Sequence, residues 1–561
     1  MFRAVRRWFG GGGAPAGQRQ GDDSVDGGDA AIEAYRAGLE MFRSGELTAA
    51  ASHFNRAIAQ RYDLAEAHFY LAIVYRKQAR LDDAKDELLL ATTFKPEFAE
   101  AWFYLGVVAL DNKQYDEAER AFNASLHIRP EYANACNGLG SLHEQREQFR
   151  EAAAWFRRAV AAKPDFALAH SNLAYVTLRE DFDTVVGLAC ADKALELDPK
   201  LSSAHSNRAM ALQMQGRCQE ALEACERALA LEPGRAGTLM VRALTLLMSG
   251  EFAAGWADYE ARKQVLPTFK VRLFPYPEWD GTLLAGQRVL VAHEQGLGDE
   301  IMFASCLPDL LQMEGEFTVE CSGKLEQLFR RSFPKARIVV ADQARADMTY
   351  LKQLPRFDWV VSAGSLPMYF RKSWPDFPPH AGYLKADEKK VAYWRDRLRQ
   401  SGEGVKVGVS WRGGRHYTNS AGRSIALDQL LPLLTAPGVQ CVSLQYTDCD
   451  EEIERLARQH GVKLQHWQEA IDDYDETAAL VCALDLVVTV QTAIVHLAGS
   501  LGRPAWVLVP STPEWRYLAE GDRMPWYPSV RLFRCGAEAN WSAVVEKIAS
   551  DLKRSSAPRP S

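Results

Sequence analysis

A repeat of about 34 residues occupies the first half of this 561-residue chain and constrains its fold more than any other feature. Prolines recur there at intervals of 34, 34, 35 and 34 residues. Each unit also has a small residue at its eighth and at its twentieth position. Small residues let two helices approach closely, and a proline ends the second helix because its nitrogen cannot donate the next hydrogen bond. We therefore predict a stack of helix pairs over about 31–262. The prolines are Pro96, Pro130, Pro164, Pro199 and Pro233, and the eighth positions are Gly38, Ala72, Gly106, Gly140, Ala174 and Ala209.

Composition excludes several classes of protein. With 47% hydrophobic and 25% charged residues, the chain has the make-up of a soluble globular protein. A net charge of -7 provides no basic face for nucleic acid. The apolar runs are too short to cross a bilayer. The ten cysteines show no metal or disulfide spacing and are typical of reduced thiols in a cytoplasmic protein.

The basic, aromatic N-terminus is predicted to be the end of a disordered leader over 1–29. Weak contact of this segment with an anionic membrane surface is the alternative.

The repeat pattern resembles the tetratricopeptide repeat, with six full units and a final helix pair that lacks the closing proline. The resemblance implies an α-solenoid over 30–262 whose groove binds an extended peptide or protein. Asn172 and Asn207 hold equivalent positions, which resembles the asparagine ladder of the O-GlcNAc transferase repeats. An Asn amide can bond a peptide N–H and a C=O at once. Ordinary solvated surface is the alternative. The expected groove residues are Phe69, Phe103, Asn137, Asn172 and Asn207.

The second half changes period. After a linker at 263–287, short β-branched runs alternate with helix-like segments. Two such series predict two doubly wound, Rossmann-like α/β domains, over 288–388 and 389–555, facing each other across a cleft. A tail at 556–561 follows. The predicted strands lie at 287–293, 317–320, 337–340, 359–361, 405–411, 439–444, 484–489, 504–509 and 530–533.

Two motifs of this half carry a family resemblance. A strand leads into Gly296-Leu-Gly-Asp299 and a helix, and Gln491-Thr-Ala-Ile-Val-His496 follows much later. Together they resemble glycosyltransferase family 9, the heptosyltransferase-like enzymes of the GT-B fold, over about 275–555. Repeats followed by such a domain are similar to bacterial repeat-coupled glycosyltransferases, including those proposed to modify flagellin. The resemblance implies an inverting transfer of a hexose or heptose from a nucleotide-sugar donor, with no further cofactor.

The first motif supplies the expected base. In the resembling enzymes the acid at this turn removes the proton of the acceptor hydroxyl, and Asp299 is the matching position. Gly296 and Gly298 give the turn its freedom. The alternative is that Asp299 only caps the following helix, and Glu294 and Glu300 are competing acids.

The second motif supplies the expected donor site. A helix that begins around Thr492 and Ala493 would present free N–H groups to a diphosphate. His496, one turn further, could bond phosphate or ribose, or could be an ordinary core residue. Gln491 stands where the family usually has Asp; it keeps an acceptor oxygen but loses the charge. This change could make the loop looser, alter the choice of donor, or abolish activity.

A basic, glycine-rich loop at 412–424 lies between the two motifs. Arg415 or Arg423 could neutralise a diphosphate without any metal, although Arg423 could instead pair with a surface acid. Gln445 is placed by analogy to meet the ribose or base. Asp448-Cys-Asp450 has the letters of a metal-binding D-x-D signature, but the acids after it indicate a helix start. We therefore expect a metal-independent transfer.

Three functions remain open from the sequence. In the first, the repeats recruit a protein or glycan acceptor to a glycosyltransferase. In the second, the repeats are a non-catalytic scaffold beside a degenerate transferase-like domain, which Gln491 favours. The third is a nucleotide-sugar epimerase, which would need no acceptor.

Overall fold

The computed structural model describes residues 27–266, 272–282, 285–341, 348–414, 422–536 and 540–556. Most of the predicted leader at 1–29 lies outside these ranges, and so does Arg415. The chain divides into two compact units, 1–211 and 212–561. Within the described ranges, none of the helices combines the length and the apolar character that a membrane crossing requires.

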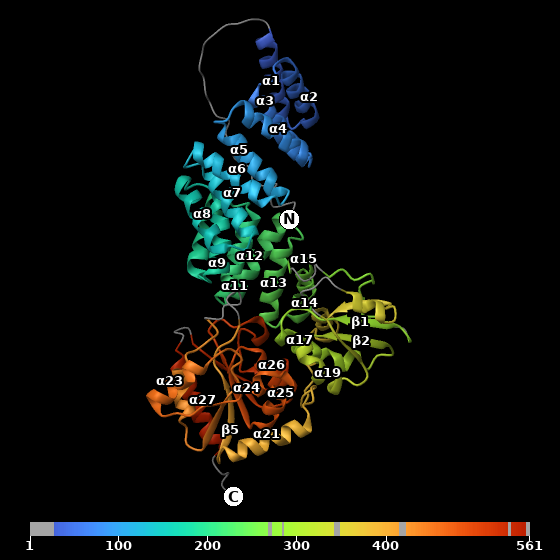
Figure 1. Ribbon diagram of the computed structural model, residues 1–561, viewed down its shortest axis with the longest axis vertical. Coiled ribbons are helices and arrows are strands. Elements are labelled where there is room, and N and C mark those ends of the chain that lie inside the picture. The colour runs from blue at the N-terminus through green and yellow to red at the C-terminus, as the bar shows by residue number, and fades with distance from the viewer. Residues whose placement is uncertain are drawn as a thin grey trace. The chain divides into compact units, whose positions relative to one another are not determined.

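The first unit consists of paired helices, drawn from blue to green in Figure 1. Each odd-numbered helix packs against the even-numbered helix that follows it. The predicted repeat of helix pairs is therefore confirmed. The helices are α1 (Gly27–Ser44), α2 (Leu47–Gln60), α3 (Ala65–Lys77), α4 (Leu81–Phe94), α5 (Ala99–Asp111), α6 (Tyr115–Ile128), α7 (Ala133–Gln145), α8 (Phe149–Ala162), α9 (Ala167–Glu180) and α10 (Thr184–Leu197), and α11 (Ser202–Met214) crosses the unit boundary.

The small eighth residues have the expected role. A Cβ atom on Gly106 would lie 2.6 Å from the ring of Phe122 in the next helix. Gly38 and Gly140 meet Phe54 and Phe156 in the same way, at 2.6 and 2.5 Å. Close packing of the two helices of a pair therefore requires glycine where the facing residue is Phe.

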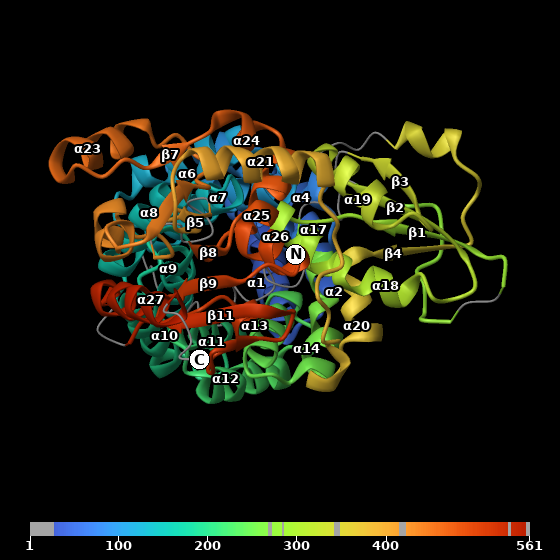
Figure 2. The ribbon, with the colours of Figure 1, turned by 90° about the horizontal axis from the view of Figure 1, so that it is seen from below.

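The second unit opens with helices and continues into two sheets (Figure 2). The helices are α12 (Cys218–Leu231), α13 (Ala236–Met248), α14 (Phe252–Tyr259) and α15 (Arg262–Val265). The first sheet is parallel, in the order β3-β2-β1-β4. Its strands are β1 (Arg288–Ala292), β2 (Glu316–Cys321), β3 (Arg337–Val340) and β4 (Trp359–Ser362).

The second sheet has seven strands in the order β10-β11-β9-β8-β5-β6-β7. All neighbours are parallel except β10 and β11. Its strands are β5 (Val405–Ser410), β6 (Val439–Ser443), β7 (Gln465–His466), β8 (Leu486–Val490), β9 (Ala505–Val509), β10 (Arg523–Met524) and β11 (Tyr527–Arg534). The predicted strands are all present, which confirms the mixed α/β class of the second half. The two that were not predicted, β7 and β10, are two-residue strands at the sheet edges.

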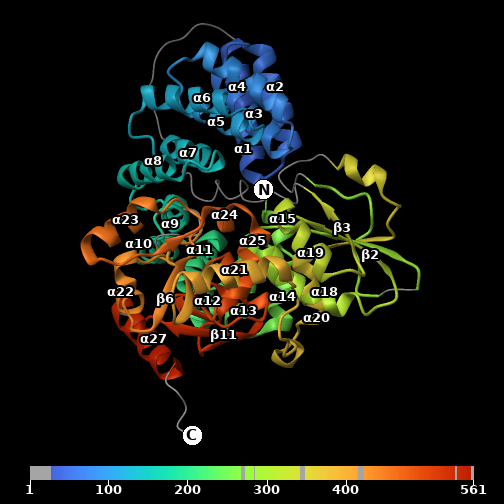
Figure 3. The ribbon, with the colours of Figure 1, turned by 60° about the horizontal axis from the view of Figure 1, so that its bottom comes forward.

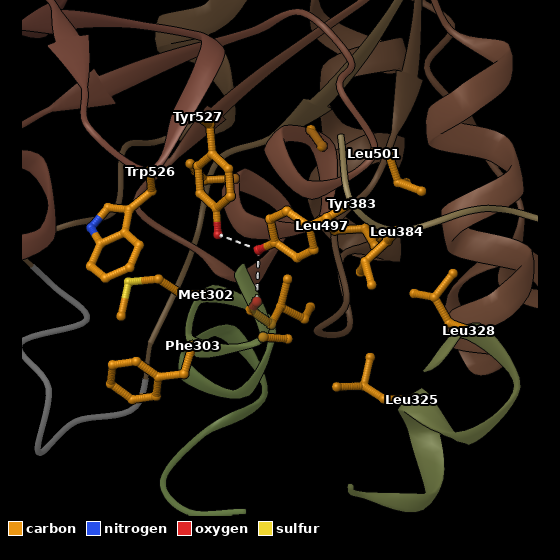
Figure 4. Packing of buried hydrophobic residues seen from close by; sticks show 14 of the residues in the cluster. Met302, Phe303, Leu325, Leu328, Tyr383, Leu384, Leu497, Leu501, Trp526 and Tyr527 are labelled. Atoms are coloured by element: carbon orange, nitrogen blue, oxygen red, sulfur yellow. Dashed lines mark hydrogen bonds between the residues drawn. The ribbon is translucent and has the colours of Figure 1, made fainter. Parts of the chain in front are cut away.

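Helices connect and cover the strands of both sheets. Helix α21 (Glu388–Gln400) lies beside α25 (Tyr474–Ala483) in Figure 3. Figure 4 shows where residues of the two series pack together: the Tyr383 hydroxyl donates to the carbonyl of Ile301 at 2.7 Å and lies 3.4 Å from the hydroxyl of Tyr527. The two sheets therefore share one apolar core in this unit.

Helices α13 and α14 also belong to that core. Their buried residues Phe252, Trp256 and Tyr259 are in the same cluster as strand residues of both sheets. The unit boundary accordingly falls near residue 211, not at 262 where the repeat pattern ends. The sequence pattern gives no sign of this change, because the residues that pack helix on helix also pack helix on sheet.

Candidate functional site

The two predicted motifs meet at the carboxyl ends of β1 and β8. Helix α17 (Leu297–Phe303) follows β1, and α26 (Ala493–Ser500) follows β8; the two helices pack side by side, as Figure 2 shows. A Cβ atom on Gly298 would lie 3.0 Å from Cδ2 of His496 and 3.5 Å from Cα of Ala493. The second glycine of the motif thus lies where α26 leaves little room for a side chain.

Asp299 makes two contacts. Its Oδ2 accepts a hydrogen bond from the backbone N–H of Gly296 at 3.3 Å, which is the helix-capping interaction expected as the alternative. Its Oδ1 forms an ion pair with Nη2 of Arg516. The carboxylate is therefore both a cap and the partner of a cation from the other sheet.

The two competing acids have other partners. Glu294 is buried and accepts from the backbone N–H of Gly364 at 2.6 Å and from Arg262 at 2.8 Å. Glu300 is also buried and accepts from the backbone N–H of Ser322 at 2.7 Å. The side chain of Asp299 keeps 17% of its surface exposed, which leaves it the most accessible of the three acids.

Arg516 is a site residue that sequence reasoning missed. It lies in the short helix η9 (Trp515–Tyr517), in the loop after β9. Its Nη1 pairs with Glu514 at 2.7 Å, and Glu514 also pairs with Arg423. Burial disfavours its charged form, but Asp299 and Glu514 outweigh that effect and raise the pKa of Arg516. The sequence signal that could have pointed to Arg516 is its place in the loop after a predicted parallel strand, where ligands of such sheets bind.

Helix α26 begins at the predicted place, and Thr492 caps it. The Thr492 hydroxyl accepts from the N–H of Ile494 at 3.2 Å, and Ala493 is the first helical residue. His496 is buried, with Nδ1 3.0 Å from the hydroxyl of Tyr527. Burial, helped by the charge of Arg516, lowers the pKa of His496 to about 3. Its ring is therefore neutral near pH 7.

Gln491 lies directly before this helix start. Its side chain is buried, and neither of its amide atoms has a hydrogen-bond partner among the described residues. A buried amide without partners costs roughly 1–3 kcal/mol. Such a group is suited to a polar ligand that would complete its hydrogen bonds.

The amide of Gln445 bonds other parts of the protein. It is fully buried, and its Oε1 accepts from the backbone N–H groups of Trp411 and Arg412 at 3.1 and 3.0 Å. Its Nε2 donates to the carbonyl of Arg412 at 3.1 Å and to Thr447 at 2.8 Å. With its amide used in this way, the expected contact with a ribose or base is corrected to a role in holding the loop after β5.

That loop lies against the start of α26. A Cβ atom on Gly413 would overlap Cγ2 of Thr492, and the N–H of Gly413 donates to the hydroxyl of Ser424 at 3.2 Å. Arg423, beside Ser424, makes the expected alternative contact with an acid, Glu514. The glycine-rich loop therefore brings Arg423 to the same place as Asp299 and Arg516.

The expected groove residues of the repeats are partly corrected. Phe69 and Phe103 are buried in the apolar clusters of the repeats instead of lining an exposed surface. Asn172 donates to Oδ1 of Asn137 at 3.0 Å. Asn207 donates to the carbonyl of Ser171 at 2.7 Å. These amides link successive helix pairs, which sequence equivalence alone did not indicate.

One group in the described part of the chain has metal-ligand chemistry. Ligand atoms of Cys449, Asp450 and His466 lie within 4.8 Å of one another. Asp450 begins α23 (Asp450–His460), whose N-terminal end is positive and disfavours a cation. Arg412, paired with Glu452 at 2.8 Å, adds a second positive charge nearby. We assign no metal to this group.

Comparison with known families defines the class of the first part. Models described as tetratricopeptide repeat match residues 35–93, 73–133, 109–174 and 202–235. These residues are thus tetratricopeptide repeats, and the chain continues beyond them into an α/β part. Similar solved structures include PilF of Pseudomonas aeruginosa, 16% identical, with a TM-score of 0.35 and covering 37% of this chain and 95% of that one. Another is the Cut9–Hcn1 assembly, 14% identical, with a TM-score of 0.36 and covering 39% of this chain and 43% of that one.

A curated relative is more similar in sequence. Protein FlbA of Caulobacter vibrioides is 34% identical over 392 residues, which cover 66% of this chain and 64% of that protein. The chain therefore matches less than two thirds of the length of this relative. Because the match is longer than the repeat region, it includes part of the α/β region.

Proposed function

We propose that this protein is a glycosyltransferase that moves a sugar from a nucleotide-sugar to an acceptor recruited by its repeats. The observation that carries the proposal is the meeting of Asp299, Arg516 and the start of α26 at the carboxyl ends of parallel strands of two sheets. Ligands of doubly wound sheets bind at those ends. Two such sheets in one unit also favour the GT-B fold that the motifs resemble.

The described residues suit the donor phosphate. The N-terminal end of α26 offers backbone N–H groups and a positive dipole end. Arg516 and Arg423 supply positive charge, and Gln491 supplies an amide that has no hydrogen-bond partner among the residues that the structure describes. In this arrangement Arg516 exchanges partners: it pairs with Asp299 until phosphate arrives, and then turns to the phosphate and leaves the carboxylate accessible.

The transfer itself is a single displacement. The oxygen of the acceptor hydroxyl forms a bond to the anomeric carbon while the bond from that carbon to the phosphate oxygen breaks. The hydroxyl proton passes to the Asp299 carboxylate, and the nucleotide leaves with the electron pair of the broken bond. Attack opposite the leaving group inverts the anomeric centre. The neutral ring of His496 can donate or accept one hydrogen bond without adding charge.

The substitution Asp299→Asn tests the proposal. Purified full-length protein is incubated with a panel of nucleotide-sugars, with and without co-purified partner proteins, and nucleotide release and product mass are measured. Loss of a base lowers the turnover number by about 10²–10⁴-fold, and stabilisation by the matching nucleotide is retained in a thermal shift. The control Glu520→Gln changes an exposed acid in the loop of Arg516 and leaves turnover unchanged. Equal rates in wild type and Asp299→Asn would exclude Asp299 as the base.

Two further outcomes separate the alternatives. If no nucleoside mono- or diphosphate raises the melting temperature and no nucleotide-sugar is consumed, the non-catalytic scaffold is favoured, because a specific ligand must stabilise the state it binds. A donor whose sugar changes configuration without any acceptor would favour the epimerase.

A further inference from the structure

We infer that helices α13–α15, here called the positioning helices, form part of the proposed active site by holding the loops that carry Asp299 and Arg516. The inference rests on the proposed function. These helices end the repeat series along the chain, yet they pack in the core of the α/β part.

The first contact is with the turn before Asp299. Nε2 of Gln295 donates to the hydroxyl of Tyr259 at 2.9 Å. Gln295 has a φ of 64°, a left-handed conformation that is uncommon outside glycine and persists only where neighbours enforce it. The next residue is Gly296, whose N–H binds the Asp299 carboxylate. Tyr259 therefore fixes the turn that sets the place of the carboxylate.

The second contact is a buried ion pair. Arg262 is fully buried and donates to Glu294 and to the hydroxyl of Ser365, both at 2.8 Å. Burial opposes its charge, but Glu294 and Glu260 outweigh burial and raise the pKa of Arg262. Removing one partner of such a pair leaves an uncompensated buried charge. The pair fixes Glu294, the residue before Gln295.

The third contact is with the loop of the other sheet. The ring centroid of Trp256 lies 5.5 Å from that of Trp515, and the ring of Tyr259 lies 5.9 Å from Trp515. The backbone N–H of Ala519 donates to the carbonyl of Met248 at 2.8 Å. Trp515 and Ala519 flank Arg516. One helix group thus holds both partners of the Asp299–Arg516 pair.

This arrangement links the positioning helices to the turnover number. Tyr259 and Arg262 are buried and bond Gln295 and Glu294, so both act on the site as positioning residues. A small displacement of a catalytic group can lower turnover by up to about a hundredfold. Changes in these helices should therefore lower the turnover number more than they change donor binding or global stability.

The substitution Tyr259→Phe in the full chain tests this inference. It keeps the ring and removes the hydroxyl. We expect the turnover number to fall about tenfold, with KM for the donor and the melting temperature little changed. Hydrogen exchange of the segment 293–300 should become faster. The control Tyr369→Phe removes the hydroxyl of a partly buried Tyr that donates to the carbonyl of Trp279 at 2.7 Å. It should leave turnover and exchange at 293–300 unchanged.

A second variant separates positioning from stability. Gln295→Gly removes the amide but also relieves the left-handed strain, so its melting temperature should not fall. We expect its turnover number to fall nevertheless. Unchanged turnover and unchanged exchange at 293–300 in both variants would overturn the inference. If the wild type turns over no nucleotide-sugar, the proposed function fails, and the exchange measurement alone still decides whether Tyr259 orders this turn.

Discussion

At the scale of single residues, sequence motifs predicted some residues of the site and missed others. Asp299, Thr492 and His496 were predicted because glycine turns and helix starts leave local patterns. Arg516 was not, because its partner is 217 residues away in the chain. The hydrogen bonds of Gln445 were missed for the same reason: they depend on backbone groups of a neighbouring strand end.

The buried histidine predicts a pH dependence of stability. The unfolded chain binds a proton at His496 near pH 6.5, whereas the folded chain does so only near pH 3. Below pH 6.5 the unfolded state therefore binds more protons, and the free energy of unfolding falls as pH decreases toward 3. His496→Gln should make this decrease smaller in denaturant unfolding at pH 7, 5 and 4. The control His460→Gln changes an exposed histidine; an equal slope in both variants would contradict the assignment.

At the scale of elements, the repeats show a size match within each helix pair. Where the eighth residue is Gly, the residue sixteen positions later is Phe, as in Gly106 and Phe122. Where it is Ala, the later residue is smaller, as in Ala72 with Leu88 and Ala174 with Cys190. A smaller partner thereby leaves room for the methyl group of Ala at the helix crossing, as close packing requires.

This match predicts a rescue. Gly106→Ala should destabilise the repeats by about 1–3 kcal/mol through overpacking against Phe122, in spite of the better helix propensity of Ala. Adding Phe122→Leu recreates the Ala–Leu pair of another unit, so the double variant should be more stable than the sum of the single effects indicates. A double-mutant cycle from denaturant unfolding measures the coupling, and strict additivity would contradict the match.

Another regularity of the repeats was not predicted. The fourth residue of several units donates a side-chain hydrogen bond to the carbonyl six residues earlier. Different residue types share this geometry, so no sequence pattern marks it. They are Trp102 to Pro96 at 2.8 Å, His170 to Pro164 at 2.9 Å and His205 to Pro199 at 2.9 Å.

At the scale of the whole molecule, the sequence predicted two kinds of architecture but not the boundary between the compact units. Periodicity changes at 262, whereas packing changes near 211. Periodicity reports which face of a helix is apolar, and it does not report what covers that face. The buried aromatic residues of α14 could equally have met another helix pair.

The boundary predicts different behaviour of two truncated chains. A chain that begins at 263 lacks α13, α14 and Arg262, and it exposes the surface around Trp515, Trp526 and Phe377, which are buried in the full chain. We expect it to aggregate and to bind an apolar dye. A chain that begins at 212 keeps those helices and should stay monodisperse in gel filtration. Equal solubility and dye binding of the two chains would show that the cover is dispensable.

The order of synthesis adds a consequence of this packing. Trp256 leaves the ribosome 259 residues before its ring partner Trp515. At a translation rate of about 5–20 residues per second, the apolar face around Trp256 stays uncovered for roughly ten to fifty seconds before Trp515 is made. During biosynthesis the nascent chain thus exposes an apolar helix surface for far longer than a helix takes to form. The supply of chaperones that cover such surfaces should therefore affect the yield of folded protein more than the rate of folding does.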